Sequence, residues 1–280
     1  MSSLTVKDIR EKKGRERIVA LTAYDALMAR LVDEAGCDLI LVGDSLGMLV
    51  LGYENTLPVT MEEMIHHAKA VRRGVRRALL VGDMPFLSYQ VGKEEAIRNA
   101  GRFLKEAGCA AVKIEGGQEM ADIISAVVRA GIPVLGHIGL TPQTAQSLGG
   151  FKVQGRDEEG ARKILEDARV LEEAGVFALI LECIPAALSG LITEQVSIPT
   201  IGIGAGPQVD GQILVLHDLL GLFEEFRPRF AKAYVQLAPQ IRQALSAYTE
   251  EVRKGVFPRE EHSFQIKEDV LSRIKESLEN

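Results

Sequence analysis

The chain has 280 residues, of which 46% are hydrophobic and 26% are charged, and its formal net charge is −6. These proportions are typical of globular proteins and exclude a disordered or collagen-like chain. The negative charge argues against a nucleic-acid partner, because phosphate neutralisation requires an excess of Lys and Arg. The strongest apolar runs, such as DLILVG from Asp38, are far shorter than the roughly 20 residues of a membrane helix, so no membrane partner is expected.

The cysteines and the N-terminal segment indicate the compartment. Cys37, Cys109 and Cys183 are dispersed, so they form neither a disulfide framework nor a C-x-x-C zinc site. The opening segment MSSLTVKDIREKKGRE lacks the apolar core of a secretory signal and carries too many acids for a transit peptide. We therefore expect a cytoplasmic protein.

An Ala-Gly pair recurs at four places, each time after a charged segment with apolar residues at helical spacing. The pairs follow Glu34, Glu106, Arg129 and Glu173. Glycine suits the left-handed position that ends a helix. The short run of Val, Ile and Leu after each pair is typical of a parallel strand that is buried on both faces. The pattern therefore predicts alternating helices and strands.

In chain order, we predict strands at residues 18–24, 39–43, 78–82, 110–115, 133–138, 177–182, 200–204 and 213–217. The clearest helices are predicted at 60–77, 93–107, 119–130 and 158–174, and the first opens with a capping box from Thr60 to Glu63. Eight alternating strands predict an α/β fold of the (β/α)8 TIM barrel type. A doubly wound open sheet is the alternative, because alternation alone does not show closure. We predict a single barrel domain over residues 1–280, with a C-terminal helical extension from about residue 230.

Charged side chains end several of the predicted strands. Asp44, Asp83, Glu115, His137 and Glu182 all occupy such positions. In a barrel these residues meet at one face, where active sites lie, although any single acid there is also compatible with a helix cap. Converging carboxylates repel unless a cation or a proton lies among them. Oxygen ligands without nearby thiols favour Mg²⁺, and Glu182, on a separate strand, is then free to act as a base.

Other residues near the strand ends allow more than one interpretation. Lys113 shares a strand face with Glu115, so it offers a positive charge to a substrate carboxylate or keto oxygen. His137 is compatible with substrate contact, a proton relay or a structural role. Cys183 is expected to be a small buried apolar residue, because adjacent strand residues face opposite ways. The glycines of Gly202–Gly206 lack the spacing of a dinucleotide site, and they fit close backbone approach better than a phosphate cradle.

An ordered set of motifs resembles the ketopantoate hydroxymethyltransferase family over about residues 4–264. The motifs are GDSLG (43–47), LPVT (57–60), GDMPF (82–86), VKIEGG (112–117), GHIGLTPQ (136–143), LGGFKVQGR (148–156), LECIP (181–185), PTIGIGAG (199–206), GQILVLHD (211–218) and EHSF (261–264). Each motif is weak by itself, but the ordered set is specific.

The resemblance implies a (β/α)8 barrel that assembles as a homodecamer. It implies transfer of a one-carbon unit from 5,10-methylenetetrahydrofolate to 3-methyl-2-oxobutanoate, through a Mg²⁺-stabilised enolate, on the route to pantothenate and coenzyme A. By motif, the Mg²⁺ ligands are Asp44, Asp83 and Glu115. The keto-acid positions are Asp44, Ser45, Asp83 and Lys113. The proton acceptor is Glu182.

Two other functions remain open at this point. A metal-dependent barrel enzyme that acts on 2-oxo acids, such as a carbon–carbon lyase of the phosphoenolpyruvate mutase type, would share the acid cluster but need no folate. A non-enzymatic binding protein on a barrel scaffold would leave the cluster without a purpose.

Overall fold

The computed structural model describes residues 3–145, 149–225 and 228–279. Leu148, the first residue of the motif at 148–156, lies outside these ranges. The chain divides into two compact units, Met1–Tyr234 and Val235–Asn280, each of which is described by itself. The organisation as one domain stays a prediction.

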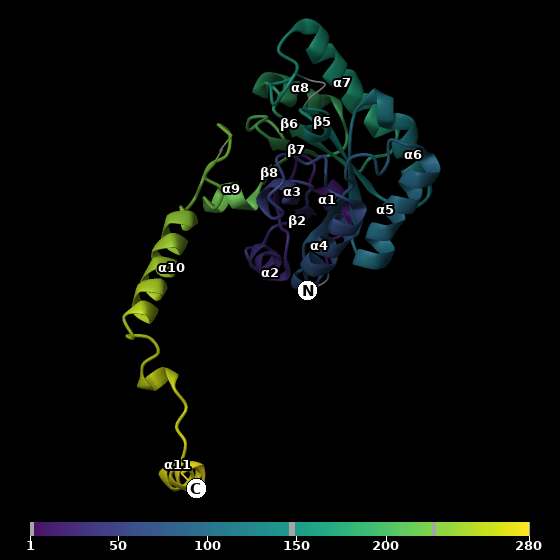
Figure 1. Cartoon of the computed structure of the whole chain (residues 1–280). Helices are drawn as coiled ribbons and strands as arrows, with labels where there is room; N and C mark the ends of the chain where they lie inside the picture. Colours follow the sequence, from purple (N-terminus) through teal and green to yellow (C-terminus); the bar gives the residue numbers. More distant parts are fainter. Residues whose placement is uncertain (1–2, 146–148, 226–227, 280) are drawn as a thin grey trace. The chain divides into compact units, whose positions relative to one another are not determined.

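The first unit contains a closed barrel of eight parallel strands in chain order (Figure 1). The strands are β1 (Ile18–Thr22), β2 (Leu39–Val42), β3 (Leu79–Asp83), β4 (Ala111–Glu115), β5 (Val134–Gly139), β6 (Ala178–Glu182), β7 (Thr200–Ile203) and β8 (Gly211–Leu214). The last strand pairs with the first, from Ile18 opposite Gly211 to Leu21 opposite Leu214. This pairing confirms the (β/α)8 barrel and excludes the open sheet.

Helices connect the strands and cover the barrel. They are α1 (Val6–Glu11), α2 (Ala26–Glu34), α3 (Leu46–Leu49), α4 (Met61–Gly74), α5 (Lys93–Ala107), α6 (Ala121–Arg129), α7 (Glu158–Glu173), α8 (Ala186–Gln195) and α9 (Leu216–Leu220), with the short 3-10 helices η1 (Gln118–Met120) and η2 (Pro142–Thr144). The predicted capping box at α4 is confirmed, because Thr60 and Glu63 each accept the other's backbone N–H. The four Ala-Gly glycines all have positive φ, as predicted for helix ends.

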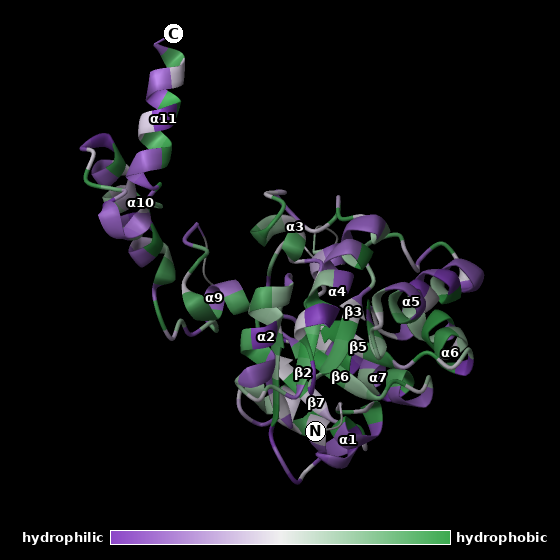
Figure 2. Ribbon diagram, turned by 90° about the horizontal axis from the view of Figure 1, so that it is seen from below, coloured by the Kyte–Doolittle hydropathy of each residue, from purple (hydrophilic) through white to green (hydrophobic). Residues whose placement is uncertain are grey.

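The hydrophobic core has two layers that follow the alternation of side chains along the strands. Leu39 and Leu41 of β2 belong to the cluster inside the barrel, together with Leu79 and Val81 of β3. Ile40 lies between Leu39 and Leu41 in the strand, and its side chain points the opposite way. It belongs to the cluster between the strands and the surrounding helices. Figure 2 shows the hydrophobic strands at the centre of this unit, with the helices around them.

Two differences from the sequence-based prediction concern the eighth strand and the N-terminal segment. The eighth strand was predicted at 213–217, but β8 begins at Gly211, and the residues from Leu216 start α9. Gly211 can pair this closely with β1 because it has no side chain. A Cβ at this position would lie only 2.5 Å from the carbonyl oxygen of Ile18. The N-terminal segment forms the unpredicted helix α1, whose Ile9 is fully buried in the barrel cluster.

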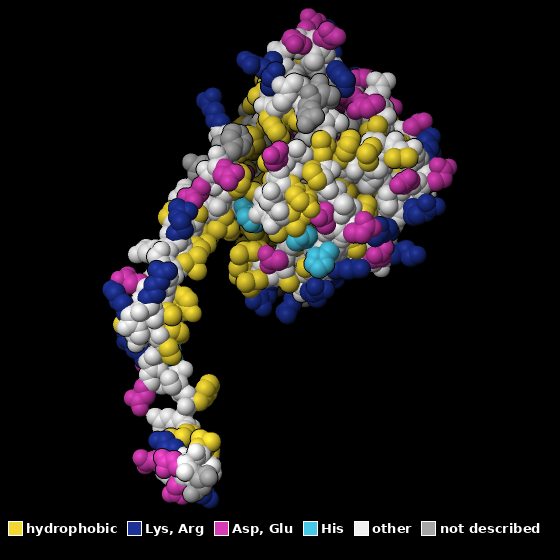
Figure 3. All heavy atoms as spheres, viewed as in Figure 1, with side chains coloured by type: hydrophobic (Ala, Val, Ile, Leu, Met, Phe, Trp, Pro, Cys, Tyr) yellow, Lys and Arg dark blue, Asp and Glu magenta, His cyan; other side chains and the backbone are white. Residues whose placement is uncertain are grey.

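The second unit contains α10 (Leu237–Arg253), the 3-10 helix η3 (Glu260–His262) and α11 (Glu268–Leu278). Exposed apolar side chains recur along α10 at helical spacing, at Ile241, Leu245, Tyr248 and Val252. Figure 3 shows hydrophobic side chains in yellow along this unit. Among the described residues, no helix combines the length and the apolar character that a membrane crossing requires.

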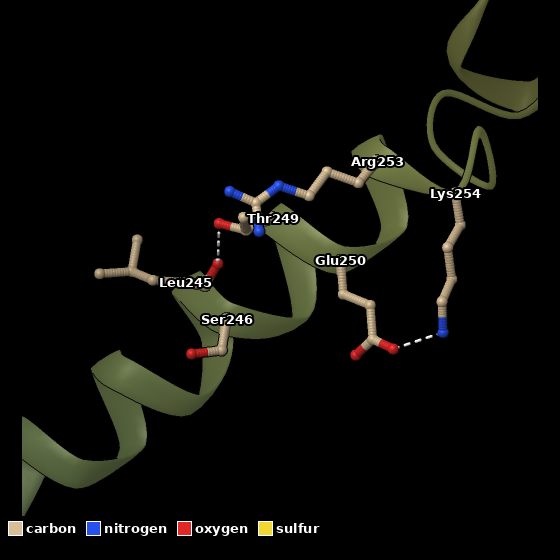
Figure 4. A pocket seen from close by; sticks show the side chains of 6 residues that line it. All are labelled: Leu245, Ser246, Thr249, Glu250, Arg253 and Lys254. Atoms are coloured by element: carbon tan, nitrogen blue, oxygen red, sulfur yellow. Dashed lines mark hydrogen bonds and ion pairs between the residues drawn. The ribbon is translucent and has the colours of Figure 1, made fainter.

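A hollow on α10 offers no enclosed site. Figure 4 shows its lining residues, Leu245, Ser246, Thr249, Glu250, Arg253 and Lys254. Thr249 Oγ1 donates to the Leu245 carbonyl oxygen, and Lys254 pairs with Glu250. Because every lining side chain comes from the exposed helix α10 or from its C-cap residue Lys254, a ligand there would stay open to solvent. The candidate site therefore lies in the barrel.

Candidate active site

The strand register brings the predicted polar residues to one end of the barrel interior. Asp83 of β3 lies opposite Lys113 of β4, and Glu115 lies opposite His137 of β5. Glu182 ends β6 opposite Gly139. Asp83, Lys113, Glu115, His137 and Glu182 continue the inward-facing positions of their strands, so strand alternation points their side chains into the barrel.

Lys113 lies between two carboxylates at the centre of this group. Its Nζ donates to Asp83 Oδ1 at 2.7 Å and to Glu115 Oε1 at 3.0 Å. All three side chains are almost completely buried. Burial alone would lower the pKa of Lys113, but the surrounding carboxylates raise it well above its usual value. Lys113 is therefore a fixed cation.

Asp44 joins the group from the segment after β2. Its backbone N–H donates to Asp83 Oδ2 at 3.1 Å, and its own Oδ2 accepts a hydrogen bond from Gln143 Nε2 at 2.9 Å. Burial and the charge of Asp83 raise the pKa of Asp44 well above its usual range. A negative charge on Asp44 is therefore unfavourable unless a cation lies beside it.

His137 connects this group to the proposed base. Its Nδ1 lies 3.4 Å from Glu115 Oε1, and its Nε2 lies 3.2 Å from Glu182 Oε2. Neither nitrogen makes a well-aligned hydrogen bond among the described residues, so these contacts are ion pairs. Burial alone would lower the pKa of His137, but the two carboxylates raise it to about 9. For Glu115, burial is outweighed by Lys113 and His137, which lower its pKa to about 2.

Ser45 belongs to a second hydrogen-bonded group on the same side of the barrel. Its Oγ lies 2.9 Å from the hydroxyl of Tyr24, to which Thr22 Oγ1 also donates at 2.9 Å. Thr22 Oγ1 accepts in turn from the backbone N–H of Leu216 at 3.1 Å. Burial raises the pKa of the Tyr24 hydroxyl above its usual value, so this hydroxyl keeps its proton. These hydrogen bonds connect Ser45, through Tyr24 and Thr22, to the start of α9.

A cavity of about 900 Å³ opens onto these side chains. Its inner wall includes Asp44, Ser45, Asp83, Lys113, Glu115, His137 and Glu182. Apolar residues such as Ile180, Ile203 and Phe230 form much of the remaining wall. All of the sequence-predicted site residues therefore contact one cavity, within the first unit.

Cys183 also lines this cavity, contrary to the sequence-based expectation of a buried apolar residue. That expectation treated Cys183 as part of a strand, but β6 ends at Glu182 and Cys183 has φ +49°. The turn directs consecutive side chains toward the same space. Burial raises the pKa of the Cys183 thiol to about 12, so this thiol is not an activated nucleophile.

The glycine-rich segment after β7 packs closely against neighbouring chain. Gly204 has φ +64°, and a Cβ there would lie 2.7 Å from Phe230 Cδ1. At Gly206, with φ +77°, a Cβ would lie 2.3 Å from that of Ala186. These approaches agree with the preferred interpretation of the segment as a place of close backbone contact.

The donor set suits a hard divalent cation in chemistry and charge. Asp44, Asp83 and Glu115 offer buried carboxylate oxygens, the ligands that Mg²⁺ prefers. Among the described residues, Lys113 pairs with Asp83 and Glu115, and His137 pairs with Glu115. Burial and the charge of Asp83 disfavour the ionised form of Asp44, so a cation beside Asp44 would stabilise that carboxylate. Within the described ranges, however, no three His, Cys, Asp or Glu side chains surround a common point as ligands. The carboxylate oxygens instead contact Lys113 and Gln143.

Gln143, Tyr89 and Tyr24 were not singled out from the sequence. Gln143 ends the motif GHIGLTPQ, and that position was the only sequence signal for it. Tyr89 and Tyr24 lie in segments whose residues reach the site only through the fold. The fold and the inward acid cluster define the class of protein, a (β/α)8-barrel enzyme with its site at the carboxyl ends of the strands.

Sequence comparison identifies the family within that class. Residues 3–260 match the family described as ketopantoate hydroxymethyltransferase. The chain is 58% identical over 275 residues to the 3-methyl-2-oxobutanoate hydroxymethyltransferase of Syntrophomonas wolfei, covering 98% of this chain and 100% of that one. It is 58% identical over 264 residues to the enzyme of the same name from Desulfotalea psychrophila, covering 94% and 95%. The chain belongs to the ketopantoate hydroxymethyltransferase family and is a transferase enzyme.

Solved structures independently support the fold. A 2,3-dimethylmalate lyase, a member of the PEP mutase/isocitrate lyase superfamily, matches with a TM-score of 0.58 at 18% identity, covering 99% of this chain and 97% of that chain. A phosphonopyruvate hydrolase in complex with oxalate and Mg²⁺ matches with a TM-score of 0.57 at 16% identity, with the same coverage. At these identities the likeness concerns the barrel fold alone.

Proposed function

We propose that this enzyme transfers a hydroxymethyl unit from 5,10-methylenetetrahydrofolate to 3-methyl-2-oxobutanoate. The product is 2-dehydropantoate, an intermediate of pantothenate and coenzyme A biosynthesis. The observation that carries the proposal is the arrangement at the cavity wall, where Lys113 and three buried carboxylates lie beside the His137–Glu182 pair. Family membership supplies the reaction, and this arrangement supplies residues for each part of it.

The keto acid binds among Asp44, Ser45, Asp83 and Lys113 in this proposal. The Nζ of Lys113 attracts the substrate carboxylate or keto oxygen, and the Ser45 hydroxyl offers a hydrogen bond. Asp44, Asp83 and Glu115 would hold Mg²⁺. When bound, this ion would stabilise negative charge on the substrate oxygens.

Glu182 removes the proton from C3 of the keto acid. The electron pair of that C–H bond then forms the new bond to the methylene carbon of the folate. Both carbon–nitrogen bonds from this methylene carbon to tetrahydrofolate break, and water supplies the hydroxyl group. The two released nitrogens take up the C3 proton, by way of Glu182, and one proton of the water. Protonated His137, 3.2 Å from Glu182, holds the carboxylate in place. A cavity of about 900 Å³ exceeds the size of the five-carbon keto acid and leaves space for the donor.

Proton NMR of the full chain in D₂O tests the reaction. With 3-methyl-2-oxobutanoate, Mg²⁺ and methylenetetrahydrofolate, we expect ketopantoate resonances, which disappear when EDTA removes the metal. Loss of the C3 proton signal without product would show that enolisation occurs but that the donor is wrong. If folded, Mg²⁺-loaded protein gives neither ketopantoate resonances nor loss of the C3 proton signal, the proposal is overturned. That result would favour a lyase acting on other 2-oxo acids.

The base assignment has its own test. Glu182→Gln keeps the size of the side chain but removes its basicity, so C3 exchange and turnover should fall by about 10²–10⁴-fold while keto-acid binding persists. Glu94→Gln, at an exposed position in the first turn of α5, is the matched control and should behave like wild type. Near-normal turnover of Glu182→Gln would reject Glu182 as the base.

The homodecamer implied by the family is also a proposal. Its support here is the exposed apolar stripe of α10, which contact with another copy would remove from water. Sedimentation velocity on the full chain should give a mass near ten times 30.5 kDa. A species at the monomer mass under assay conditions would refute it.

A further inference from the structure

The side chain of Gln143 lies in the acid cluster, and it belongs to the 3-10 helix η2 that follows β5. It is 3% exposed. Its Nε2 donates to Asp44 Oδ2 at 2.9 Å and to the carbonyl oxygen of Met84 at 2.9 Å. Its backbone N–H donates to Glu115 Oε2 at 3.1 Å. One residue thus holds an oxygen of each of two carboxylates that come from different strand ends.

The orientation of this amide is determined by its partners. The carbonyl of Met84 can only accept a hydrogen bond, so the NH₂ group must face it, and the same nitrogen donates to Asp44 Oδ2. The opposite side, Oε1, accepts a hydrogen bond from the hydroxyl of Tyr89 at 2.8 Å. A flipped amide would place Oε1 against the carbonyl oxygen of Met84 and would leave buried polar groups unsatisfied. Gln143 therefore has one favourable arrangement.

Tyr89 fixes that arrangement from the segment between β3 and α5. Its side chain is 1% exposed, and its hydroxyl also lies 3.1 Å from the carbonyl oxygen of Glu115. Because Gln143 Oε1 can only accept, the Tyr89 hydroxyl is the donor in this contact. The contacts run from Tyr89 to Gln143 and from Gln143 to Asp44.

We infer that Gln143 is a positioning residue that holds Asp44 and Glu115 ready for a divalent cation, and that Tyr89 acts through Gln143. The inference rests on the proposed function, because it takes these two carboxylates as cation ligands. Neither Gln143 nor Tyr89 contacts the reacting atoms in this account. Partners that orient metal ligands typically contribute 10–100-fold to metal affinity or activity.

The test measures the Kd of Mg²⁺ by titration calorimetry on the full chain, with and without 3-methyl-2-oxobutanoate. Gln143→Leu removes both donors of the amide at similar volume and should raise the Kd by about 10–100-fold. Gln143→Glu keeps the length but presents an acceptor to Asp44 and Met84, so it should lose at least as much affinity. Gln212→Leu removes an amide that, within the described part of the chain, donates to the Gly206 carbonyl oxygen, and it should leave the Kd unchanged.

A double-mutant cycle tests the role of Tyr89. Tyr89→Phe removes only the hydroxyl and should raise the Kd several-fold in the wild-type background. It should have no further effect on Gln143→Leu if it acts through Gln143. Tyr89→Phe also keeps the inference testable if Gln143→Leu fails to fold. For Tyr89→Phe, steady-state kinetics should show a raised KM for the keto acid and for Mg²⁺, with a smaller change in kcat. The Tm of this variant should stay near the wild-type value.

The outcomes separate this inference from the proposed function. If wild type shows no Mg²⁺ binding, the proposed metal site fails. If wild type binds Mg²⁺ and folded Gln143→Leu binds it within twofold of the same Kd, the positioning role is refuted. If the effects of Tyr89→Phe and Gln143→Leu add fully, Tyr89 does not act through Gln143.

Discussion

Gly82 offers a sharp test of how the barrel wall is packed next to the site. It lies in β3 directly before Asp83 and faces the helix layer, where Phe103 of α5 covers it. A Cβ at position 82 would lie 2.2 Å from Phe103 Cδ1 and 2.6 Å from Cε1. Ordinary contacts begin at about 3.4 Å, so Gly82→Ala forces a displacement of more than 1 Å.

The displacement has no easy outlet, because Phe103 is fully buried. Gly82 is also paired in the sheet with Val42 on one side and Val112 on the other. Overpacking of this kind costs about 1–3 kcal/mol, and the short distance places Gly82→Ala near 3 kcal/mol. At about 2–4 °C per kcal/mol for a chain of this size, Tm should fall by about 6–12 °C.

Thermal and urea unfolding of the full chain provide the assay. Gly101→Ala in α5 is the matched control, because a Cβ there meets nothing within 4 Å. Alanine is favoured over glycine inside a helix by about 0.5–1 kcal/mol, so this variant should be slightly more stable than wild type. The double variant Gly82→Ala/Phe103→Leu should lose less free energy of unfolding than the two single variants lose in total. The difference should be at least about 1 kcal/mol. An unchanged Tm for Gly82→Ala, or strict additivity in the double variant, would refute the reasoning.

Three further predictions follow from particular contacts. Asp83→Ala should lose Mg²⁺ and keto-acid binding together in a calorimetric titration, because Asp83 contacts both Lys113 and Asp44; unchanged binding would remove it from the site. For Asp210, hydrogen bonds from Lys13 and backbone amides outweigh burial and lower the pKa below 3.8. Its contribution to stability is therefore present above about pH 4 and lost below it, so urea midpoints of Asp210→Asn and wild type should converge in acid. Thr60→Ala should cost about 1 kcal/mol in the same assay through loss of the α4 cap, and a neutral effect would contradict this.

Local patterns in the sequence were sufficient for much of the fold. The alternation of charged helical segments with short apolar runs placed the strands close to their observed positions, except for β8. The Ala-Gly pairs and the capping box at Thr60 marked helix ends, because caps depend on a few neighbouring residues. The acids at strand ends marked the candidate site, because all strands of a parallel barrel present their carboxyl ends on one face.

Other features depended on the closed barrel. Closure itself rests on the pairing of β1 with β8, which lie almost 200 residues apart and carry no local signal for each other. The direction of Cys183 depends on the turn after β6, and strand alternation predicts it wrongly once the strand has ended. Gln143 reaches Asp44 across a separation of 99 residues. A hydrogen bond between residues so far apart in the sequence depends on the strand register and on the paths of the two loops that carry them. Only the tertiary structure therefore decides which carboxylates this amide contacts.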